Sequence, residues 1–245
     1  SNEIFKLCRE NYKSTQSEYK LFVSKTTEEF QTIKNDSKKV ISYMVKEFEM
    51  KKSADQYARA SVSKSGSLDM GRLHTYKYND DLFKKVTTLP GATNHGMVMV
   101  VDWSGSMYEN LTGTLSQLYN LIWFCRRTQI PFEVYAFSNS HRVLRDENGD
   151  IHPYLESFKA GNLVLDNMKL LNFFSNKMTV SQEMTMMHFL WMVANQFGYN
   201  NNNKYGLPCS MPSIFGLSST PLNHAIIAMM NIVPKFKKET GVQKV

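Results

Sequence analysis

The chain becomes polar at the point where its most apolar short run ends. Residues 97–101, MVMVV, carry no charge and are followed at once by residues 102–106, DWSGS. A short β-branched run of this kind predicts a buried strand, as found in parallel sheets. Apolar residues at helical spacing over 111–125 then predict a helix of about five turns. Together these restrict the chain to an α/β fold, with the polar turn at the carboxyl edge of the sheet, where ligands usually bind.

The turn carries oxygen-bearing side chains at alternate positions, Asp102, Ser104 and Ser106. Alternate residues of a loop can face one side, which would direct a carboxylate and two hydroxyls into one small volume. Gly105 permits a sharp turn between the two serines. Hard oxygen ligands with little charge suit Mg²⁺, which retains water and accepts one or two carboxylates. The residues therefore predict a Mg²⁺ or other divalent cation site; an ordinary polar strand-to-helix turn is the alternative.

This Asp-x-Ser-Gly-Ser pattern, followed by Met107, resembles the metal-ion-dependent adhesion site (MIDAS) of von Willebrand factor A (VWA) domains. The resemblance implies a doubly wound, mainly parallel α/β sheet of the VWA, Rossmann-like class. In that family a threonine from a distant loop contributes to the metal site, and the sequence TPLNHA at 220–225 resembles that loop. The resemblance therefore implies Thr220 as a further ligand. The residues alone also allow Thr220 to cap the helix that begins at Pro221.

The family's remaining ligand is an aspartate, usually in a Thr-Asp-Gly run after the next strand, and no such run is present. We expect the chain to be truncated at Val245, where that strand would begin; the alternative is a member that lacks this ligand.

Residues upstream of the strand indicate a branch of the family. Over about residues 50–245 the chain resembles the C-terminal part of the cobaltochelatase CobT subunit, and more closely the CobT-like VWA proteins of large tailed phages. Trp103 departs from the asparagine that is usual there. The resemblance implies a non-catalytic adaptor that works in the cytoplasm, or the infected host's cytoplasm, with an AAA+ ATPase, and whose metal binds a partner carboxylate. The upstream residues that carry the resemblance are Gly66, Leu68, Asp69, Leu73, Asp81, Phe83 and Lys84.

Three segments are expected along the chain. Residues 1–60 lack Gly and Pro and predict a helical extension that packs on the domain, with a partner-binding helix as the alternative. Residues 61–95 are expected to connect, with an edge strand over 82–88. Residues 96–245 are expected to form the VWA-like domain. Within that domain we expect a strand at 132–137, a hairpin at Asn148-Gly149, and helices at 180–197 and 221–235.

Composition and missing motifs argue against several classes of function. The net charge of +7 is spread along the chain, without the dense basic stripe of a dedicated nucleic-acid binder, so association with RNA or DNA is kept only as the alternative function. No apolar run is long enough to span a membrane, and no signal peptide is seen. Three widely spaced cysteines predict free thiols. No H-E-x-x-H, phosphate-binding loop or G-x-S-x-G occurs, which argues against peptidase or ATPase activity in this chain.

Overall fold

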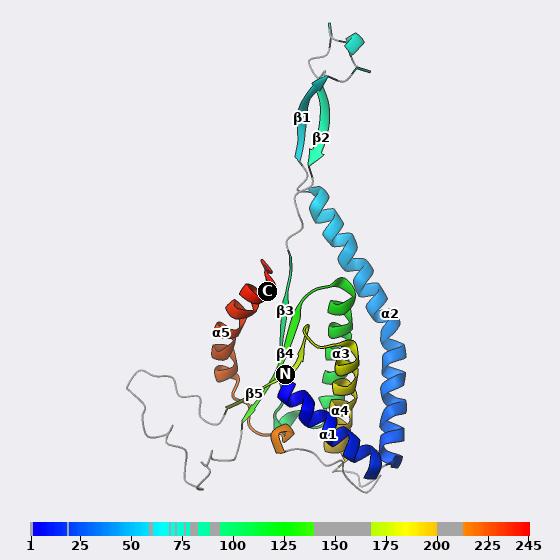
Figure 1. Ribbon diagram of the computed structural model, residues 1–245, viewed down its shortest axis with the longest axis vertical. Coiled ribbons are helices and arrows are strands. Elements are labelled where there is room, and N and C mark those ends of the chain that lie inside the picture. Colours follow the sequence, from blue (N-terminus) through cyan, green and yellow to red (C-terminus); the bar gives the residue numbers. More distant parts are fainter. Residues whose placement is uncertain are drawn as a thin grey trace, which may run out of the picture. The chain divides into compact units, whose positions relative to one another are not determined.

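A computed structural model describes residues 2–18, 20–58, 61–68, 70–71, 73–75, 77–78, 83–88, 94–139, 168–199 and 213–245 (Figure 1). The chain divides into two compact units, Ser1–Ile41 with Asn94–Val245, and Ser42–Thr93. The expected hairpin at Asn148-Gly149 and the third cysteine, Cys209, lie outside the described residues. No helix within the described ranges is both long enough and apolar enough to cross a membrane.

The described residues among the first 58 are helical, as predicted. They form α1 (Asn2–Glu18) and α2 (Lys20–Ala58). In the first unit α1 packs against α4 (Val180–Tyr199). The buried residues Phe22, Thr26 and Phe30 recur every four positions of α2, which gives this helix an inward face. The expectation that the helical extension packs on the domain is therefore confirmed for its first part.

The second unit contains a two-stranded antiparallel sheet. Its strands are β1 (Ser61–Leu68) and β2 (Phe83–Thr88), and Ser61 pairs with Thr88. The strand expected over 82–88 is therefore present, but its described partner is β1. It does not join the larger sheet as the edge strand that we predicted.

The first unit contains a mixed three-stranded sheet in the order β3-β4-β5. Its strands are β3 (Met97–Asp102), β4 (Phe132–Asn139) and β5 (Met168–Ser175). β3 and β4 are parallel, whereas β4 and β5 are antiparallel. The α/β class is confirmed, but the central position expected for β3 is wrong for the described sheet. β4 lies between two strands and is mostly buried, while Val100 of β3 is 40% exposed.

Isolated bridges join the residues that flank β3 to the C-terminal part of the described chain. Met97 N donates to Pro131 O, on the side of β4, whereas the adjacent Gly96 N donates to Lys244 O at 2.8 Å. Successive amides of a strand point to opposite edges, so Lys244 lies on the side away from β4. Two isolated parallel bridges, His95 with Lys244 and Ser104 with Ser218, join this strand to the C-terminal segment.

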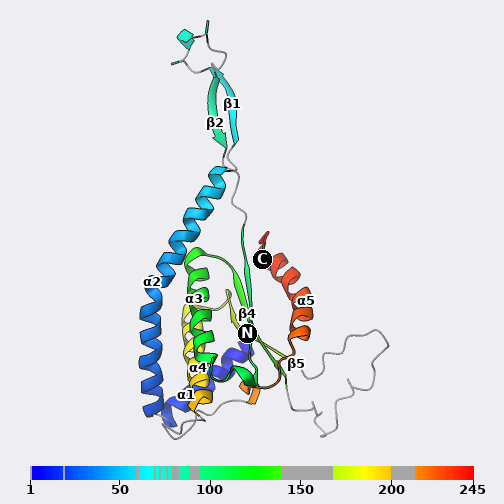
Figure 2. The same cartoon turned by 180° about the vertical axis from the view of Figure 1, so that it is seen from behind.

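Helices cover both faces of this sheet. Figures 1 and 2 show α3 (Leu111–Thr128) and α4 on one face and α5 (Leu222–Thr240) on the other. All three predicted helices are present, and α5 continues five residues beyond the expected end. A Cβ on Gly96, the residue before β3, would lie 2.6 Å from Cε1 of Phe236, so a larger residue there would force this ring of α5 to shift. The predicted apolar positions of α3 are buried: Leu111, Leu115, Leu118, Ile122 and Cys125.

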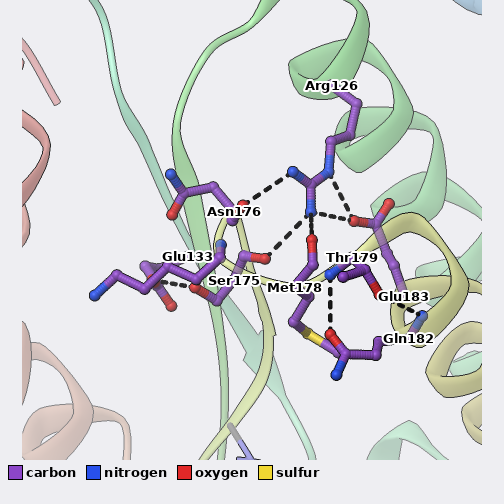
Figure 3. Close-up of polar contacts among 9 residues, drawn as sticks. Arg126, Glu133, Ser175, Asn176, Met178, Thr179, Gln182 and Glu183 are labelled. Atoms are coloured by element: carbon purple, nitrogen blue, oxygen red, sulfur yellow. Dashed lines mark hydrogen bonds and ion pairs between the residues drawn. The ribbon is translucent and has the colours of Figure 1, made fainter.

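The side chain of Arg126 joins α3 to the connection between β5 and α4 (Figure 3). Its guanidinium forms an ion pair with Glu183 at 2.7 Å and donates to the carbonyls of Asn176 and Met178. It also lies over the ring of Phe132. Burial raises the pKa of Glu183, while the hydrogen bond and charge of Arg126 act to lower it. The carboxylate of Glu183 is therefore held inside the protein by a single cation.

A buried histidine fixes the N-terminal helices to α4. His188 Nδ1 lies 2.8 Å from the Tyr12 hydroxyl, and Nε2 lies 3.1 Å from Thr27 Oγ1. Thr27 donates its own proton to the carbonyl of Val23, so its oxygen must accept from Nε2–H. Nδ1 is then the acceptor for Tyr12. Phe30 stacks on the imidazole. These contacts assign a neutral His188, and burial lowers its pKa to about 4.

Acid is expected to weaken this attachment. The unfolded chain takes up a proton at His188 near pH 6.5, whereas the folded chain does so only near pH 4. The free energy of unfolding should therefore fall by about 3 kcal/mol as the pH is lowered from 6.5 to 4. Above pH 6.5, His188 should make no contribution to its pH dependence. Urea denaturation between pH 7.5 and pH 4 measures the effect. His188→Gln should remove this pH dependence and His74→Gln should retain it; an unchanged dependence in His188→Gln would contradict the assignment.

Candidate functional site

Asp102 is the last residue of β3 and lies at the carboxyl edge of the sheet. Its side chain is half-buried, and the atom Oδ1 is buried without a hydrogen-bond partner among the described residues. Buried carboxylate oxygens are normally paired, because an unpaired one loses its hydration without compensation. An unpaired oxygen at a sheet edge is therefore a position where a ligand would be stabilising.

The two serines lie next to each other, as the alternate spacing predicted. Ser104 is buried, Ser106 is exposed, and their Oγ atoms are 3.1 Å apart. Ser106 belongs to a short 3-10 helix, η2 (Gly105–Met107), that leads toward α3. A hydroxyl has two lone pairs and a rotatable proton, so both serines can present oxygen to a cation. The loop thus brings together two of its three candidate ligands.

Trp103 attaches a distant segment to this loop. Its side chain is fully buried, and Nε1 donates to the carbonyl of Phe215 at 2.7 Å. The indole also meets the ring of Phe173 edge-on. The residue that departs from the family pattern is therefore an anchor in this chain. The sequence does not predict this role of Trp103, since its hydrogen-bond partner lies 112 positions away.

Thr220 is brought to the same edge by the bridge between Ser104 and Ser218. Gly105 N donates to Ser218 O at 2.7 Å, and Thr220 is two residues further along the chain, a reach of about 7 Å at most. Its side chain is exposed. No described hydrogen bond joins its hydroxyl to the other candidate ligands. Pro221 occupies the N-cap position of α5, and no side chain caps this helix, so capping does not account for Thr220.

Two further polar atoms were not assigned to the site from the sequence. Ser138 Oγ is buried without a partner among the described residues, and Ser138 directly follows Phe137, which pairs with Asp102 in register. The position after a neighbouring parallel strand was the signal that could have indicated it. His224 Nδ1, in the first turn of α5, is likewise buried and unpartnered in the described part of the chain. The side chain of His224 is half-buried.

The donor set fits a hard divalent cation. Asp102, Ser104 and Ser106 supply only oxygen, and the unpaired Oδ1 gives an ion a carboxylate to bind. Within the described ranges no group of three or more His, Cys, Asp and Glu side chains is arranged to hold a metal. An ion here would have one protein carboxylate and would keep several waters or exogenous ligands.

Neither a scan of protein-family models nor searches of curated proteins and of solved structures found a match to this chain.

Proposed function

We propose that this chain is a metal-dependent protein-interaction module with a VWA-like, doubly wound fold. Mg²⁺ would be held by Asp102, Ser104 and Ser106, with Thr220 as a further ligand, and a carboxylate of a partner protein would occupy an open position on the ion. The observation that carries the proposal is the buried, unpartnered Oδ1 of Asp102, in the same loop as two serine hydroxyls that lie 3.1 Å from each other. The ion would supply positive charge that attracts the partner's carboxylate.

The arrangement of the first unit supports this fold. Parallel β3 and β4 are joined by α3, helices lie on both faces of the sheet, and the loop after β3 stands at its carboxyl edge. Ligands of doubly wound sheets bind at that edge. The resemblance to CobT-like proteins directs the proposal to an adaptor of a cytoplasmic AAA+ ATPase. The chain's own residues then have binding roles: Asp102 neutralises the ion, the serines orient it, and Trp103 positions the loop.

Asp102→Ala is expected to abolish Mg²⁺-dependent binding to an AAA+ partner and to leave the fold intact. The carboxylate is the only charged group in the proposed ligand set, and removing a half-buried carboxylate with an unpaired oxygen should not lower the stability of the metal-free protein. Pull-downs with candidate ATPases, in Mg²⁺ and in EDTA, measure the binding. Thermal melts of the same samples should show a Mg²⁺-dependent rise for the wild type only.

Two further variants sharpen this test. Asp102→Asn keeps the shape of the side chain and should also lose the Mg²⁺ response. Asp36→Ala removes an exposed aspartate of α2 and should behave as the wild type. Equal binding by wild type and Asp102→Ala, with and without EDTA, would reject a metal-bridged adaptor. Binding of RNA or DNA that falls steeply with salt, and that ignores Mg²⁺ and Asp102, would favour the nucleic-acid alternative.

A further inference from the structure

The outward face of α5 carries large apolar side chains. Leu222, Ile226 and Met230 are 52%, 56% and 71% exposed. Their spacing of four residues places them along one side of the helix. Figures 1 and 2 show α5 on the opposite face of the sheet from α3 and α4. We call these three residues the α5 stripe.

The α5 stripe is additional to the face that α5 uses for folding. Ala225 and Phe236 are the buried residues of this helix, and Phe236 approaches Gly96 of the sheet. An amphipathic helix at a protein surface needs one apolar face. Single exposed apolar residues are common, whereas a contiguous row of them indicates an interaction surface. The α5 stripe is therefore a second apolar face that packing within the described chain does not require.

Positive charge lies at one end of the α5 stripe. Lys237 follows Met230 by seven residues and therefore shares its side of the helix, whereas Lys238 lies about 100° further around the helix. The only acidic residue of α5, Glu239, forms an ion pair with Lys177 at 2.7 Å. No carboxylate of α5 is therefore left to neutralise Lys237 and Lys238. A partner that covers the stripe would meet apolar surface first and then the charge of Lys237.

We propose that the α5 stripe docks an acidic amphipathic helix of a partner protein. The distance from Leu222 to Lys237 along the helix is about 22 Å, which a partner helix of about four turns would cover. Its apolar residues, spaced by three and four, would lie on the stripe, and its carboxylates would face Lys237. This proposal goes beyond the metal site and does not depend on it, although the stripe begins two residues after Thr220.

Three labelled peptides of sixteen residues test the proposal against the full chain by fluorescence anisotropy. The first is helical, with leucines at positions spaced by three and four and glutamates beside them. The second replaces the glutamates with lysines, and the third keeps the composition of the first but scatters the leucines around the helix. We expect the first peptide to bind at least about tenfold more tightly than either of the others, and more weakly as salt is raised.

Substitutions locate the binding surface. Ile226→Ser with Met230→Ser should weaken the acidic peptide roughly tenfold or more, and Lys237→Glu should weaken it by less. Leu21→Ser, at a 75% exposed leucine of α2, is the matched control and should leave binding unchanged. Binding should be the same in EDTA and in Asp102→Ala, which separates this proposal from the metal site. The proposal would be overturned if the three peptides bound equally, or if the stripe variants and the control variant had equal effects. Self-association of the chain through Met230 would also overturn it.

Discussion

Trp103→Ala is expected to lower the free energy of unfolding by about 3–5 kcal/mol, because it removes a large and fully buried side chain. The loss combines apolar burial, the cavity left beside Phe173, and the hydrogen bond to the carbonyl of Phe215. Urea denaturation of the wild type and the variant measures the difference. We also expect Trp103→Ala to release residues 213–218 from the end of β3, because the indole is their side-chain anchor there.

Trp103→Phe separates these contributions. Phenylalanine keeps most of the ring packing but cannot donate to Phe215 O, so the expected loss is about 1–3 kcal/mol. If both variants lose the same small amount, the indole does not anchor the distant segment in the manner described. A loss in Trp103→Ala that far exceeds that in Trp103→Phe would assign most of the stability to packing.

Arg126→Met is expected to cost about 3–5 kcal/mol. The substitution leaves the carboxylate of Glu183 buried without its cation, and it removes donors from the carbonyls of Asn176 and Met178. Methionine retains much of the apolar stem, so lost packing is a small part of the effect. Chemical denaturation at pH 7.5 measures it. In the double variant with Glu183→Leu no charge remains buried, and we expect about half of the loss to be recovered.

The pH dependence of the same variants gives an independent check. Burial raises the folded-state pKa of Glu183, and removing Arg126 raises it further. The folded variant therefore binds a proton at a pH where the unfolded chain does not. Its disadvantage relative to the wild type should be largest at pH 7.5 and should shrink as the pH falls toward 4.5. The wild type shares His188 with the variant, so the effect of that histidine cancels in the difference. A difference that is constant with pH, with no recovery in the double variant, would contradict the buried ion pair.

The sequence predicted secondary structure best where apolar residues follow one another, or recur at a regular spacing, without interruption. The helical stripe of α3 and the uncharged run of β3 each predicted an element that the structure contains. β5 was missed because Lys169 and Asn172 interrupt its apolar residues. The amide of Asn172 donates to the buried carboxylate of Glu133 on β4, at 2.7 Å. A polar residue that is satisfied by a neighbouring strand looks, in sequence, like a residue of a loop.

The neighbours of a strand were harder to predict than the strand itself. The run 83–88 was recognised, but its pairing with β1 was not, because alternation along one strand does not identify its partner. For the same reason β3 was expected at the centre of the sheet, a position that β4 holds.

The residues of the candidate site also differ in how well the sequence alone predicts them. Asp102, Ser104 and Ser106 are close in the chain, so the spacing of the loop residues was enough to predict that the two serines lie next to each other, directly after Asp102. Thr220 approaches the edge through the hydrogen bonds of Trp103 and Gly105 to residues 215 and 218. Only the resemblance to a family indicated it, since nothing in the spacing of the chain predicts those two bonds.

The two isolated bridges of β3 have a consequence for how tightly a ligand can bind. Ser218 and Lys244 hold the segment that contains α5 to the same strand at both of its ends. When one bridge opens, the other keeps the segment nearby, so the opened end meets its partner again at a high effective concentration. The loop of Thr220 is therefore restrained from both directions, and its conformational entropy is lost when the chain folds. A ligand that binds at the carboxyl edge, such as the Mg²⁺ that we propose, would therefore have less ordering to impose on this loop, and the proposed donor set with its single carboxylate would keep more of its intrinsic affinity.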